Sequence, residues 1–480
     1  MIQNILPTPK KLDVFQGITY IKAAITTDYD PFLEHLTVFA EAVKKIYDTP
    51  IALAEGGVCV KYNAALAENG YIFDSRDGVT VYASAVEGLM YGLATAVHAV
   101  EGCDTGLQCE KAYIEDHPDK EYRGLMVDLA RCWHPVRQVF RFIDLCFALK
   151  IRYLHLHFID DQLYTLPSKA FPELPGKRHY SFEDIAAFCD YAMLRGVILI
   201  PEFEAPGHSK QLNLKYPDVF ANNIENKDEA ILIAEGGQVI NADSLVCAGK
   251  PETMDAIRTL LAEVCEMFPN SPYIHIGGDE ANIKAWNLCP DCVKYMKEQG
   301  ISGEKELYSE FIARVTQTVL DLGRTPIVWE GFPKVGAERI PRETIVIAWE
   351  SHYHLVHDLL EEGFRVINSS WQPLYIVDNL DLHWGPKDLL EWNVYNWQHW
   401  WPESYACANP IQLEPTDQVL GAQLSIWECT YEREIGAAMH NATTLSERLW
   451  ATEQRWDDFS AYHKCHGAMI SRIARLIAEV

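Results

Sequence analysis

From about residue 121 onward, short apolar runs alternate with longer stretches of helical periodicity. The runs predict strands, and they are GLMVDLA (124–130), YLHLHF (153–158), ILIPEFE (198–204), YIHIGGDE (273–280), PIVWEG (326–331), IVIAWE (345–350), RVINSS (365–370) and GAQLSIWE (421–428). The intervening segments predict helices over Pro135–Lys150, Phe182–Arg195, Pro251–Phe268, Glu304–Leu322, Lys387–Trp397 and Leu445–Trp456. Eight such units favour an α/β fold, a (β/α)8 TIM barrel, over an open doubly wound sheet, which usually has about five to seven strands.

The first stretch, to about residue 118, has a different pattern. Short β-rich runs (ITYIKAAI, GVCVKYN, GYIFDS and VTVYAS) accompany one clear helix near Glu87–Val100, in which Leu89, Leu93 and Val97 recur at helical spacing. A sheet with helices against one face is the natural arrangement of such elements. We therefore predict a small α+β domain over residues 1–118, followed by the barrel over residues 119–480.

Composition and charge narrow the classes of partner. The chain has 480 residues, of which 48% are hydrophobic and 23% charged, so wholesale disorder is excluded. Lys and Arg total 41 against 68 Asp and Glu, a formal net charge of −27, which would repel nucleic acid and anionic membranes. No apolar run is long enough for a transmembrane helix, and the start MIQNILPTPKKLDVF lacks the pattern of a secretory signal. We expect a cytoplasmic protein whose oligomeric state the sequence leaves open.

The cysteines and histidines give weak indications of metal binding. The 13 cysteines lie mostly in apolar runs, which favours buried reduced thiols over a disulfide framework. Cys289 and Cys292 have CxxC spacing, but without a second such pair we favour buried or free thiols over structural zinc. His155 and His157 alternate on one predicted strand, where packing or hydrogen bonding is favoured over metal ligation. We therefore expect no metal. No cofactor is expected either, since the sequence has no phosphate-binding glycine loop and no Rossmann fingerprint.

Polar and aromatic side chains gather at the predicted carboxyl ends of the barrel strands, where barrel enzymes have their active sites. They include Arg131, Asp160, His208, Asp279, Glu280, Trp329, Trp349, Tyr375, Trp427 and Glu428. Tryptophan faces stack on the C–H faces of sugar rings, while carboxylates and arginine hydrogen-bond hydroxyl groups. An acidic, tryptophan-lined barrel mouth therefore predicts a carbohydrate site. The aromatic tract at 392–401 is expected to pack between a helix and a loop, or else to line the leaving-group side.

The most specific segment is HIGGDE, which ends the predicted fourth strand at residues 275–280. Neighbouring residues on an extended chain point to opposite sides. Asp279 and Glu280 can therefore reach one cleft only if the two preceding glycines bend the chain. Adjacent carboxylates raise the pKa of one member of the pair, as a general acid requires.

IHIGGDE resembles the signature of the family 20 glycoside hydrolases, the β-N-acetylhexosaminidases. YRGLMVDLAR, YLHLHFIDD and PEFEAPGH are similar to the first three strands of that family, and TIVIAWE and SIWE…SERLW to its later strands and closing helix. ILPTPKKL and GLMYGLATAVHAV resemble the small domain that precedes its barrel. The resemblance covers essentially the whole chain. It implies an exo-acting enzyme that removes terminal β-linked GlcNAc or GalNAc from a glycan or oligosaccharide.

The resemblance also implies a retaining, substrate-assisted mechanism, in which the 2-acetamido carbonyl of the substrate attacks C1. In that mechanism Glu280 is the acid and then the base, Asp279 accepts the acetamide N–H, and Tyr375 hydrogen-bonds the acetamide oxygen. The remaining sugar-binding positions that it implies are Arg131, Asp160, His208, Trp329, Trp349, Asp378, Trp427 and Glu428.

Two positions depart from the family pattern. Trp427 and Glu428 are adjacent, where the family often has Trp-x-Glu, and the spacing from Tyr375 to Asp378 is one residue longer than in Tyr-x-Asp or Tyr-x-Asn. Both positions contact outer hydroxyls in the family, so the preference for GlcNAc or GalNAc stays open. Two alternatives also remain: a member selective for a modified sugar, such as a sulfated or GalNAc-type one, and a catalytically silent sugar-binding protein. The intact pair of adjacent acids argues against the second.

Overall fold

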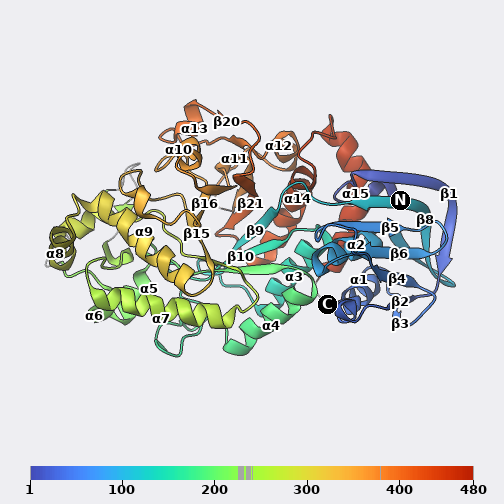
Figure 1. Cartoon of the computed structure of the whole chain (residues 1–480), viewed down its shortest axis with the longest axis horizontal. Coiled ribbons are helices and arrows are strands. Elements are labelled where there is room, and N and C mark those ends of the chain that lie inside the picture. Colours follow the sequence, from blue (N-terminus) through green and yellow to red (C-terminus); the bar gives the residue numbers. More distant parts are fainter. Residues whose placement is uncertain (1, 225–231, 234–238, 241, 379, 479–480) are drawn as a thin grey trace.

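The computed structural model describes residues 2–224, 232–233, 239–240, 242–378 and 380–478. Figure 1 shows a smaller region, which carries the N-terminus, lying beside a larger region that contains the barrel. The last helix, α15 (Phe459–Leu476), returns to the smaller region and packs against α1 and the first residues of the chain.

A mixed eight-stranded sheet forms the smaller region, in the order β1-β8-β5-β6-β4-β2-β3 with β7 paired to β8. Its strands are β1 (Lys11–Ile21), β2 (Ala24–Thr27), β3 (Ala52–Leu53), β4 (Val58–Tyr62), β5 (Tyr71–Asp74), β6 (Val79–Ala83), β7 (Val100–Cys103) and β8 (Gly106–Asp116). Two helices accompany it, α1 (Leu36–Tyr47) and α2 (Val86–Ala99). Sequence analysis predicted only α2. The β-branched residues of α1 favour a strand as much as a helix, and burial of its Leu36, Phe39 and Val43 face decides for the helix.

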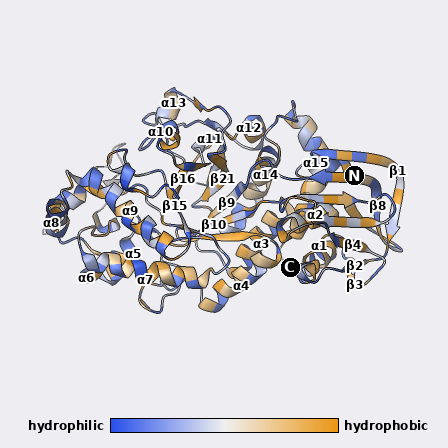
Figure 2. Cartoon of the chain, viewed as in Figure 1, coloured by the Kyte–Doolittle hydropathy of each residue, from blue (hydrophilic) through white to orange (hydrophobic). Residues whose placement is uncertain are grey.

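Helix α2 lies between the sheet and the barrel. It contacts β5 and β6 on one side and α3 (Val136–Ala148) on the other, and residues 88–99 are all buried. Figure 2 shows the hydrophobic colouring of α2 and α3 where the two regions meet. A helix that is apolar on all sides is buried on all sides, so α2 joins the two regions through a common core.

Eight parallel strands close into the barrel, because β17 pairs with both β16 and β21, and β21 pairs with β9. They are β9 (Tyr122–Asp128), β10 (Tyr153–His157), β11 (Ile198–Glu202), β14 (Tyr273–His275), β15 (Thr325–Trp329), β16 (Ile345–Ala348), β17 (Arg365–Asn368) and β21 (Val419–Trp427). The short strand β18 (Tyr375–Val377) adds to β21. The predicted TIM barrel is confirmed, and the open sheet is excluded.

Helices and short strands connect the barrel strands. The helices beyond α3 are α4 (Phe182–Leu194), α5 (Lys210–Lys215), α6 (Pro217–Phe220), α7 (Pro251–Met267), α8 (Pro290–Gln299), α9 (Glu304–Asp321), α10 (Val356–Glu361), α11 (Trp371–Leu374), α12 (Pro386–Glu391), α13 (Tyr405–Ala408) and α14 (Tyr431–Trp450). The short strands are β12 (Leu232–Ile233), β13 (Val239–Ile240), β19 (Asn396–Trp397) and β20 (Ile411–Gln412). Among the described residues, none of the helices is both long and apolar enough to cross a membrane.

Two predicted helices are wrong in their bounds. The helix predicted over Lys387–Trp397 ends at Glu391, because side chains from elsewhere bind the carbonyl groups that a longer helix would use. Arg448 Nε donates to Trp392 O at 2.9 Å, and Asn368 Nδ2 donates to Val394 O at 2.9 Å. The helix predicted over Leu445–Trp456 is α14, which begins at Tyr431 and ends at Trp450, since its buried face extends further toward the N-terminus than the apolar residues alone indicated.

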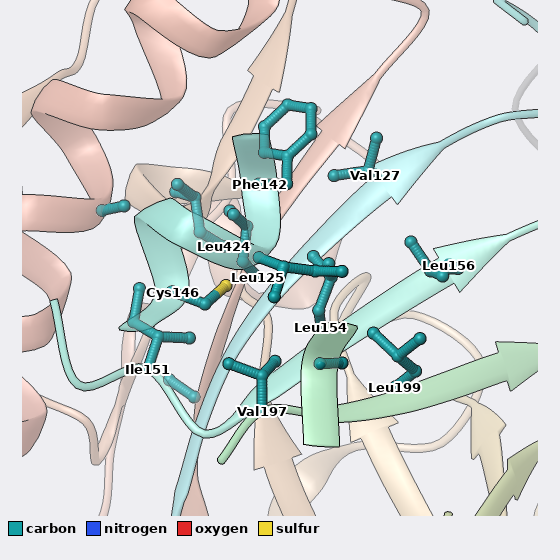
Figure 3. Close-up of a cluster of buried hydrophobic side chains, with 14 of the residues drawn as sticks. Leu125, Val127, Phe142, Cys146, Ile151, Leu154, Leu156, Val197, Leu199 and Leu424 are labelled. Carbon is teal, nitrogen blue, oxygen red and sulfur yellow. The ribbon is translucent and has the colours of Figure 1, made fainter. Parts of the chain in front are cut away.

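Apolar packing between strands and helices surrounds the barrel. Figure 3 shows Leu125, Val127, Leu154 and Leu156 from β9 and β10 in one buried cluster with Phe142 and Cys146 of α3. The alternate residue Met126 belongs to a separate inner cluster with isoleucines of the other strands. Strands that are buried on both faces read as continuous apolar runs. For this reason the sequence predicted the barrel strands. Packing on both faces of the strands also fixes the positions of their ends.

Candidate active site

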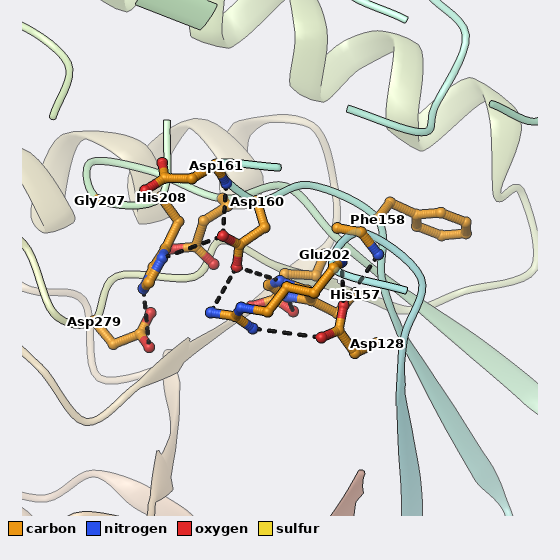
Figure 4. Close-up of polar contacts among 12 residues, drawn as sticks. Asp128, His157, Phe158, Asp160, Asp161, Glu202, Gly207, His208 and Asp279 are labelled. Atoms are coloured by element: carbon orange, nitrogen blue, oxygen red, sulfur yellow. Dashed lines mark hydrogen bonds and ion pairs between the residues drawn. The ribbon is translucent and has the colours of Figure 1, made fainter. Parts of the chain in front are cut away.

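Charged side chains at the carboxyl ends of the barrel strands form one continuous network (Figure 4). Arg131 Nη2 lies 2.7 Å from Asp160 Oδ2, and His208 Nδ1 lies 3.6 Å from Asp160 Oδ1. On its other side, His208 Nε2 is 3.8 Å from Asp279 Oδ2 and 3.5 Å from Glu280 Oε2. Despite burial, the charges of His208 and Arg131 hold the pKa of Asp160 well below its ordinary value. The structure thus brings these five predicted residues together.

Glu202 lies beneath this network, and sequence analysis gave it no role. Its carboxylate accepts hydrogen bonds from Trp329 Nε1 at 2.7 Å, His157 Nδ1 at 2.5 Å and His155 Nε2 at 3.1 Å, and it lies 2.9 Å from His275 Nδ1. Burial opposes ionisation, but the neighbouring imidazoles hold the pKa of Glu202 well below its ordinary value. Glu202 therefore fixes the Trp329 ring. It also fixes His157, whose Nε2 atom is 3.1 Å from Asp160 Oδ2, the oxygen that pairs with Arg131.

The two glycines before the adjacent acids bend the chain. Gly277 and Gly278 have φ angles of 68° and 91°, in the left-handed region that favours glycine. A Cβ atom on Gly277 would lie 2.0 Å from the Glu204 carboxylate, so a larger residue does not fit there. Glu280 itself has a φ of 44°. This bend turns the carboxylates of Asp279 and Glu280 toward the same histidine.

The raised pKa expected for the pair belongs to Asp279. Burial raises the pKa of Asp279 to about 6, the charge of His208 opposes the rise, and the charge of Glu280 adds to it. Burial also acts on Glu280, but the hydrogen bond with His208 and the charges of His208 and Arg131 outweigh it, and the pKa of Glu280 is lowered. Although burial lowers it, the pKa of His208 is raised well above its ordinary value by Asp160 and the two acids. These shifts favour a charged His208 beside an ionised Glu280.

Aromatic rings form the opposite wall of the site. Trp349 and Tyr375 are stacked with centroids 6.1 Å apart, and Trp371 stacks on Tyr375 at 4.3 Å. The pocket between the rings and the charged network has a volume of about 250 Å³. It is lined by Arg131, Asp279, Glu280, Trp329, Trp349, Trp371, Tyr375, Val377, Leu380, Trp427 and Glu428. Trp371 was not predicted, because only the strand ends were candidates and Trp371 lies one residue beyond the run RVINSS (365–370), in the short helix α11.

A second cavity, of about 200 Å³, adjoins the first at Glu280. Its lining includes Asn282, Lys284, His352 and Tyr353. Glu280 therefore stands between the two cavities, and its side chain remains partly exposed. The Glu280 carboxylate can therefore reach a bond that joins a group in one cavity to a group in the other.

The two positions that depart from the family pattern are placed differently. Glu428 lines the pocket, and its Oε1 atom is 3.8 Å from Arg131 Nε. The carboxylate of Asp378 instead lies 3.6 Å from Arg433 on α14, and Asp378 is not among the residues that line the pocket. Val377 occupies the wall in its place. Asp160 and His208 are likewise outside this lining, so the assignment of Asp378 to an outer hydroxyl of the sugar stays a prediction.

The aromatic tract at 392–401 mainly packs the barrel. Trp392 and Trp397 are buried, and Trp397 Nε1 donates to Ala348 O at 3.0 Å. Trp400 is 45% exposed, and its ring centroid is 5.7 Å from that of Trp371. The expected packing role therefore holds for the buried part, and Trp400 extends the aromatic wall outward from the pocket.

Comparisons with known proteins agree on one family. A sequence model of the catalytic domain of glycosyl hydrolase family 20 matches residues 121–453. The beta subunit of the β-hexosaminidase of Mus musculus is 26% identical over 86% of this chain and 75% of its own length. The β-hexosaminidase of Akkermansia muciniphila is 30% identical over 60% of each chain.

Solved structures show the same fold. An exo-β-N-acetylglucosaminidase of glycoside hydrolase family 20 from Vibrio harveyi, in complex with N-acetylglucosamine, superposes with a TM-score of 0.81 at 22% identity, covering 100% of this chain and 79% of that one. A β-N-acetylhexosaminidase from Bacteroides fragilis superposes with a TM-score of 0.80 at 21% identity, covering 98% of this chain and 96% of that one.

Proposed function

Because this chain belongs to glycosyl hydrolase family 20 and is a glycoside hydrolase of the β-hexosaminidase type, we propose that it removes terminal β-linked GlcNAc or GalNAc residues with retention of configuration, by substrate-assisted catalysis. The observation that carries the proposal is the convergence of Asp279 and Glu280 on His208, facing a pocket walled by aromatic rings.

The size of the pocket supports exo action. At about 250 Å³ it is smaller than the roughly 300–1,000 Å³ typical of drug-sized ligand sites, and it suits a single sugar ring. Arg131, Asp160 and Glu428 supply hydrogen-bonding groups for ring hydroxyls, and Trp427 supplies a flat face. The leaving group would occupy the second cavity beyond Glu280.

Glu280 acts as the general acid and then as the general base. Glu280 lines both cavities, which supports a location beside the glycosidic oxygen of a bound substrate. The charged imidazole of His208, 3.5 Å away, is the source of the proton. A sugar that displaces water raises the pKa of Glu280 and draws the proton onto it. After the leaving group departs, the same carboxylate removes a proton from the attacking water.

Asp279 orients the acetamide. Its Oδ1 atom is buried and has no hydrogen-bond partner among the described residues, so it is free to accept the acetamide N–H. The amide oxygen is then held beneath C1, with Tyr375 donating to it, and the negative charge of Asp279 offsets the positive charge of the oxazolinium intermediate. Trp329, Trp349 and Tyr375 surround the acetamide methyl group.

Two other carboxylates near the pocket, Asp160 and Glu350, are poor nucleophiles. Asp160 is paired with Arg131 at 2.7 Å. Burial, together with the charge of Glu280, raises the pKa of Glu350 to about 8, so this group is neutral near pH 7. These observations support a nucleophile that the substrate supplies itself.

An unmodified sugar is favoured over a sulfated one. Among the described residues that line the pocket, Arg131 is the one cation, and it is already 2.7 Å from Asp160 and 3.8 Å from Glu428. A sulfate group would need an unpaired cation, and it would be repelled by the acidic wall.

Hydrolysis of a panel of aryl β-glycosides tests the proposal. We expect turnover of the GlcNAc and GalNAc glycosides, with the β-anomer of the sugar as the first product by NMR. A cyclic thiazoline mimic of the intermediate should inhibit strongly. Comparable rates on a β-glucoside, or a covalent adduct with a 2-fluoro glycoside detected by mass spectrometry, would contradict the substrate-assisted mechanism. Binding of GlcNAc without any turnover would establish the sugar-binding alternative.

A further inference from the structure

Three buried cysteines meet beside the loops of the active site. Cys247 lies shortly before α7, and Cys289 and Cys292 lie at the start of α8. The Cys247 Sγ atom is 3.7 Å from Cys289 Sγ and 3.6 Å from Cys292 Sγ. All three sulfur atoms lie within 4.8 Å of one another. The fold thus adds a third thiol to the CxxC pair.

These separations match the edges of a metal-centred tetrahedron. Sulfur atoms bound tetrahedrally to one ion at a Zn–S distance of about 2.3 Å are about 3.8 Å apart. A disulfide would need about 2.05 Å. We propose that Cys247, Cys289 and Cys292 bind one thiophilic divalent cation, zinc in the first instance, as a structural site distinct from the active site.

The surrounding backbone offers hydrogen-bond donors to the sulfur atoms. The N–H groups of Cys292 and Asn223 donate to the sulfur of Cys289, and the N–H group of Gly249 donates to that of Cys247. A Cβ atom on Gly249 would lie 2.3 Å from Asp291 O. Only glycine therefore lets the segment before α7 approach the CxxC turn so closely. Metal-bound thiolates are stabilised by such surrounding donors.

Arg314 and Asn222 complete the surroundings of the site. The Arg314 guanidinium donates to Ala248 O at 2.9 Å and interacts electrostatically with Cys247 and Cys292. Its charge offsets the net single negative charge of three thiolates and one divalent ion. Asn222 Nδ2 donates to Leu245 O at 2.7 Å, and its Oδ1 atom lies 3.7 Å from Cys292 Sγ. That oxygen, directly or through a water molecule, is suited to the fourth corner.

The ion would join the two loops that carry the catalytic groups. The loop after β11 contains His208 and continues to Cys247, and the loop after β14 contains Glu280 and continues to Cys289. A hydrogen bond from Trp286 Nε1 to Val246 O, at 2.9 Å, already connects these segments next to the thiols. The site would therefore stabilise the position of His208 relative to Glu280.

Metal analysis of the full chain, purified from zinc-supplemented medium, tests the site. We expect about one zinc per chain by mass spectrometry of the metal. Cys289→Ser and Cys247→Ser should each lose it. Cys109→Ser is the matched control, since Cys109 is buried, lies in the sheet of the smaller region and donates to Glu110 O, a bond that serine can keep. Cys109→Ser should retain the zinc.

Cobalt keeps the test independent of whether the variants fold. Wild-type protein in which Co²⁺ replaces zinc should show thiolate-to-cobalt charge-transfer absorption and the intense visible bands of tetrahedral coordination. Removal of the ion with a strong chelator should lower Tm, and added zinc should restore it. The proposal is overturned by wild-type protein without bound metal whose three thiols are all titratable after denaturation, by a disulfide within the cluster, or by metal that stays in both cluster variants.

Discussion

Buried charges occupy both ends of the barrel, and one carboxylate at each end, Asp116 and Asp279, differs in whether its oxygens are satisfied. At the amino end of the strands, facing the N-terminal sheet, Lys150 Nζ donates to Tyr71 OH at 2.8 Å and lies 4.0 Å from Asp116 Oδ2. Trp450 Nε1 donates to the same carboxylate oxygen at 2.9 Å. At the carboxyl end, Asp279 Oδ1 is buried without a partner among the described residues.

This difference separates an interface from an active site. Buried polar groups that bind one another rigidify a fold, whereas an unpaired buried group is costly unless something else uses it. The unpaired oxygen at the carboxyl end faces a pocket that is open to a ligand. The paired Asp116 carboxylate at the amino end therefore indicates a structural role, and the unpaired Asp279 oxygen at the carboxyl end indicates binding.

The largest effect is expected for Glu280→Gln, at the incompletely paired end. Glutamine keeps the shape of the side chain but cannot exchange a proton, so turnover of substrates with poor leaving groups should fall about 10²–10⁴-fold. Activated aryl glycosides need less protonation and should lose less. Steady-state kinetics on a disaccharide and on an aryl glycoside measure the difference. Near-normal hydrolysis of the disaccharide would remove Glu280 from the acid role.

Asp279→Asn should lower turnover about 10²–10³-fold, in line with the loss of one preorganised electrostatic contact. Asparagine is nearly isosteric but neutral, so it neither offsets the charge of the intermediate nor reliably accepts the acetamide N–H. Substrate affinity should change less than kcat. The thiazoline mimic should inhibit the variant weakly, and inhibition as strong as for the wild type would contradict the assigned contact.

Glu202→Gln should lower kcat/KM about 10–100-fold, although Glu202 does not contact the substrate. The reason is that Glu202 positions His157 and Trp329, and a small misplacement of such groups is costly. The charge of Glu202 raises the pKa of His157 to about 10, although burial opposes it. In the variant this pKa should move down toward the ordinary histidine value, which NMR titration of labelled histidine can follow. An unchanged His157 titration together with normal activity would show that Glu202 has no positioning role.

The raised pKa of Asp279 predicts an acid limb in the pH dependence. Its pKa is about 6, so the carboxyl is neutral below that pH and charged above it. If the charged form is required, kcat/KM should fall about tenfold per pH unit well below pH 6. A pH profile of the wild type checks this, with the stability of the enzyme monitored at each pH. The limb should be weaker or absent in Asp279→Asn, and an identical limb in that variant would assign it to another group.

The smallest effect on activity is expected for Lys150→Met, at the amino end beside the paired Asp116 carboxylate. Loss of one partner of a buried polar network should destabilise the fold by about 3–5 kcal/mol, while kcat of the folded protein changes by less than about twofold. Thermal unfolding and kinetics below Tm measure the two effects. A large loss of kcat would mean that the two ends of the barrel are coupled, and it would contradict a purely structural role for the amino end.

The same variant has a pH signature. Burial lowers the pKa of Lys150 to about 8, from an ordinary value of 10.5. Below pH 8 both folded and unfolded chains hold the proton, and between about 8 and 10.5 the unfolded chain holds more, so this residue makes stability rise with pH in that window. The difference in stability between wild type and Lys150→Met should therefore grow in favour of the wild type from pH 8 to pH 10.

Local pattern was sufficient for the barrel and for the most specific motif. Strands that are buried on both faces are apolar throughout, so all eight barrel strands were visible as short runs. The bend at Gly277 and Gly278 was also local, since it follows from residue type alone. Helices whose ends depend on distant groups were not predictable in this way: the segment after Glu391 leaves the helix because Arg448 and Asn368 bind its carbonyl groups.

The sequence by itself determined the fold class, the order of the strands and the residues that supply the acids and most of the aromatic wall, because each depends on spacing within a few residues. Only the tertiary structure decided that Glu202 joins His157 to Trp329, that Trp371 stacks on Tyr375, that Asp378 lies near Arg433, and that Cys247 joins the CxxC pair. Most of these contacts join residues far apart in the chain, from 42 positions for Cys247 and Cys289 to 127 for Glu202 and Trp329. Such pairs meet only when the barrel closes, and no local periodicity records which of them will meet.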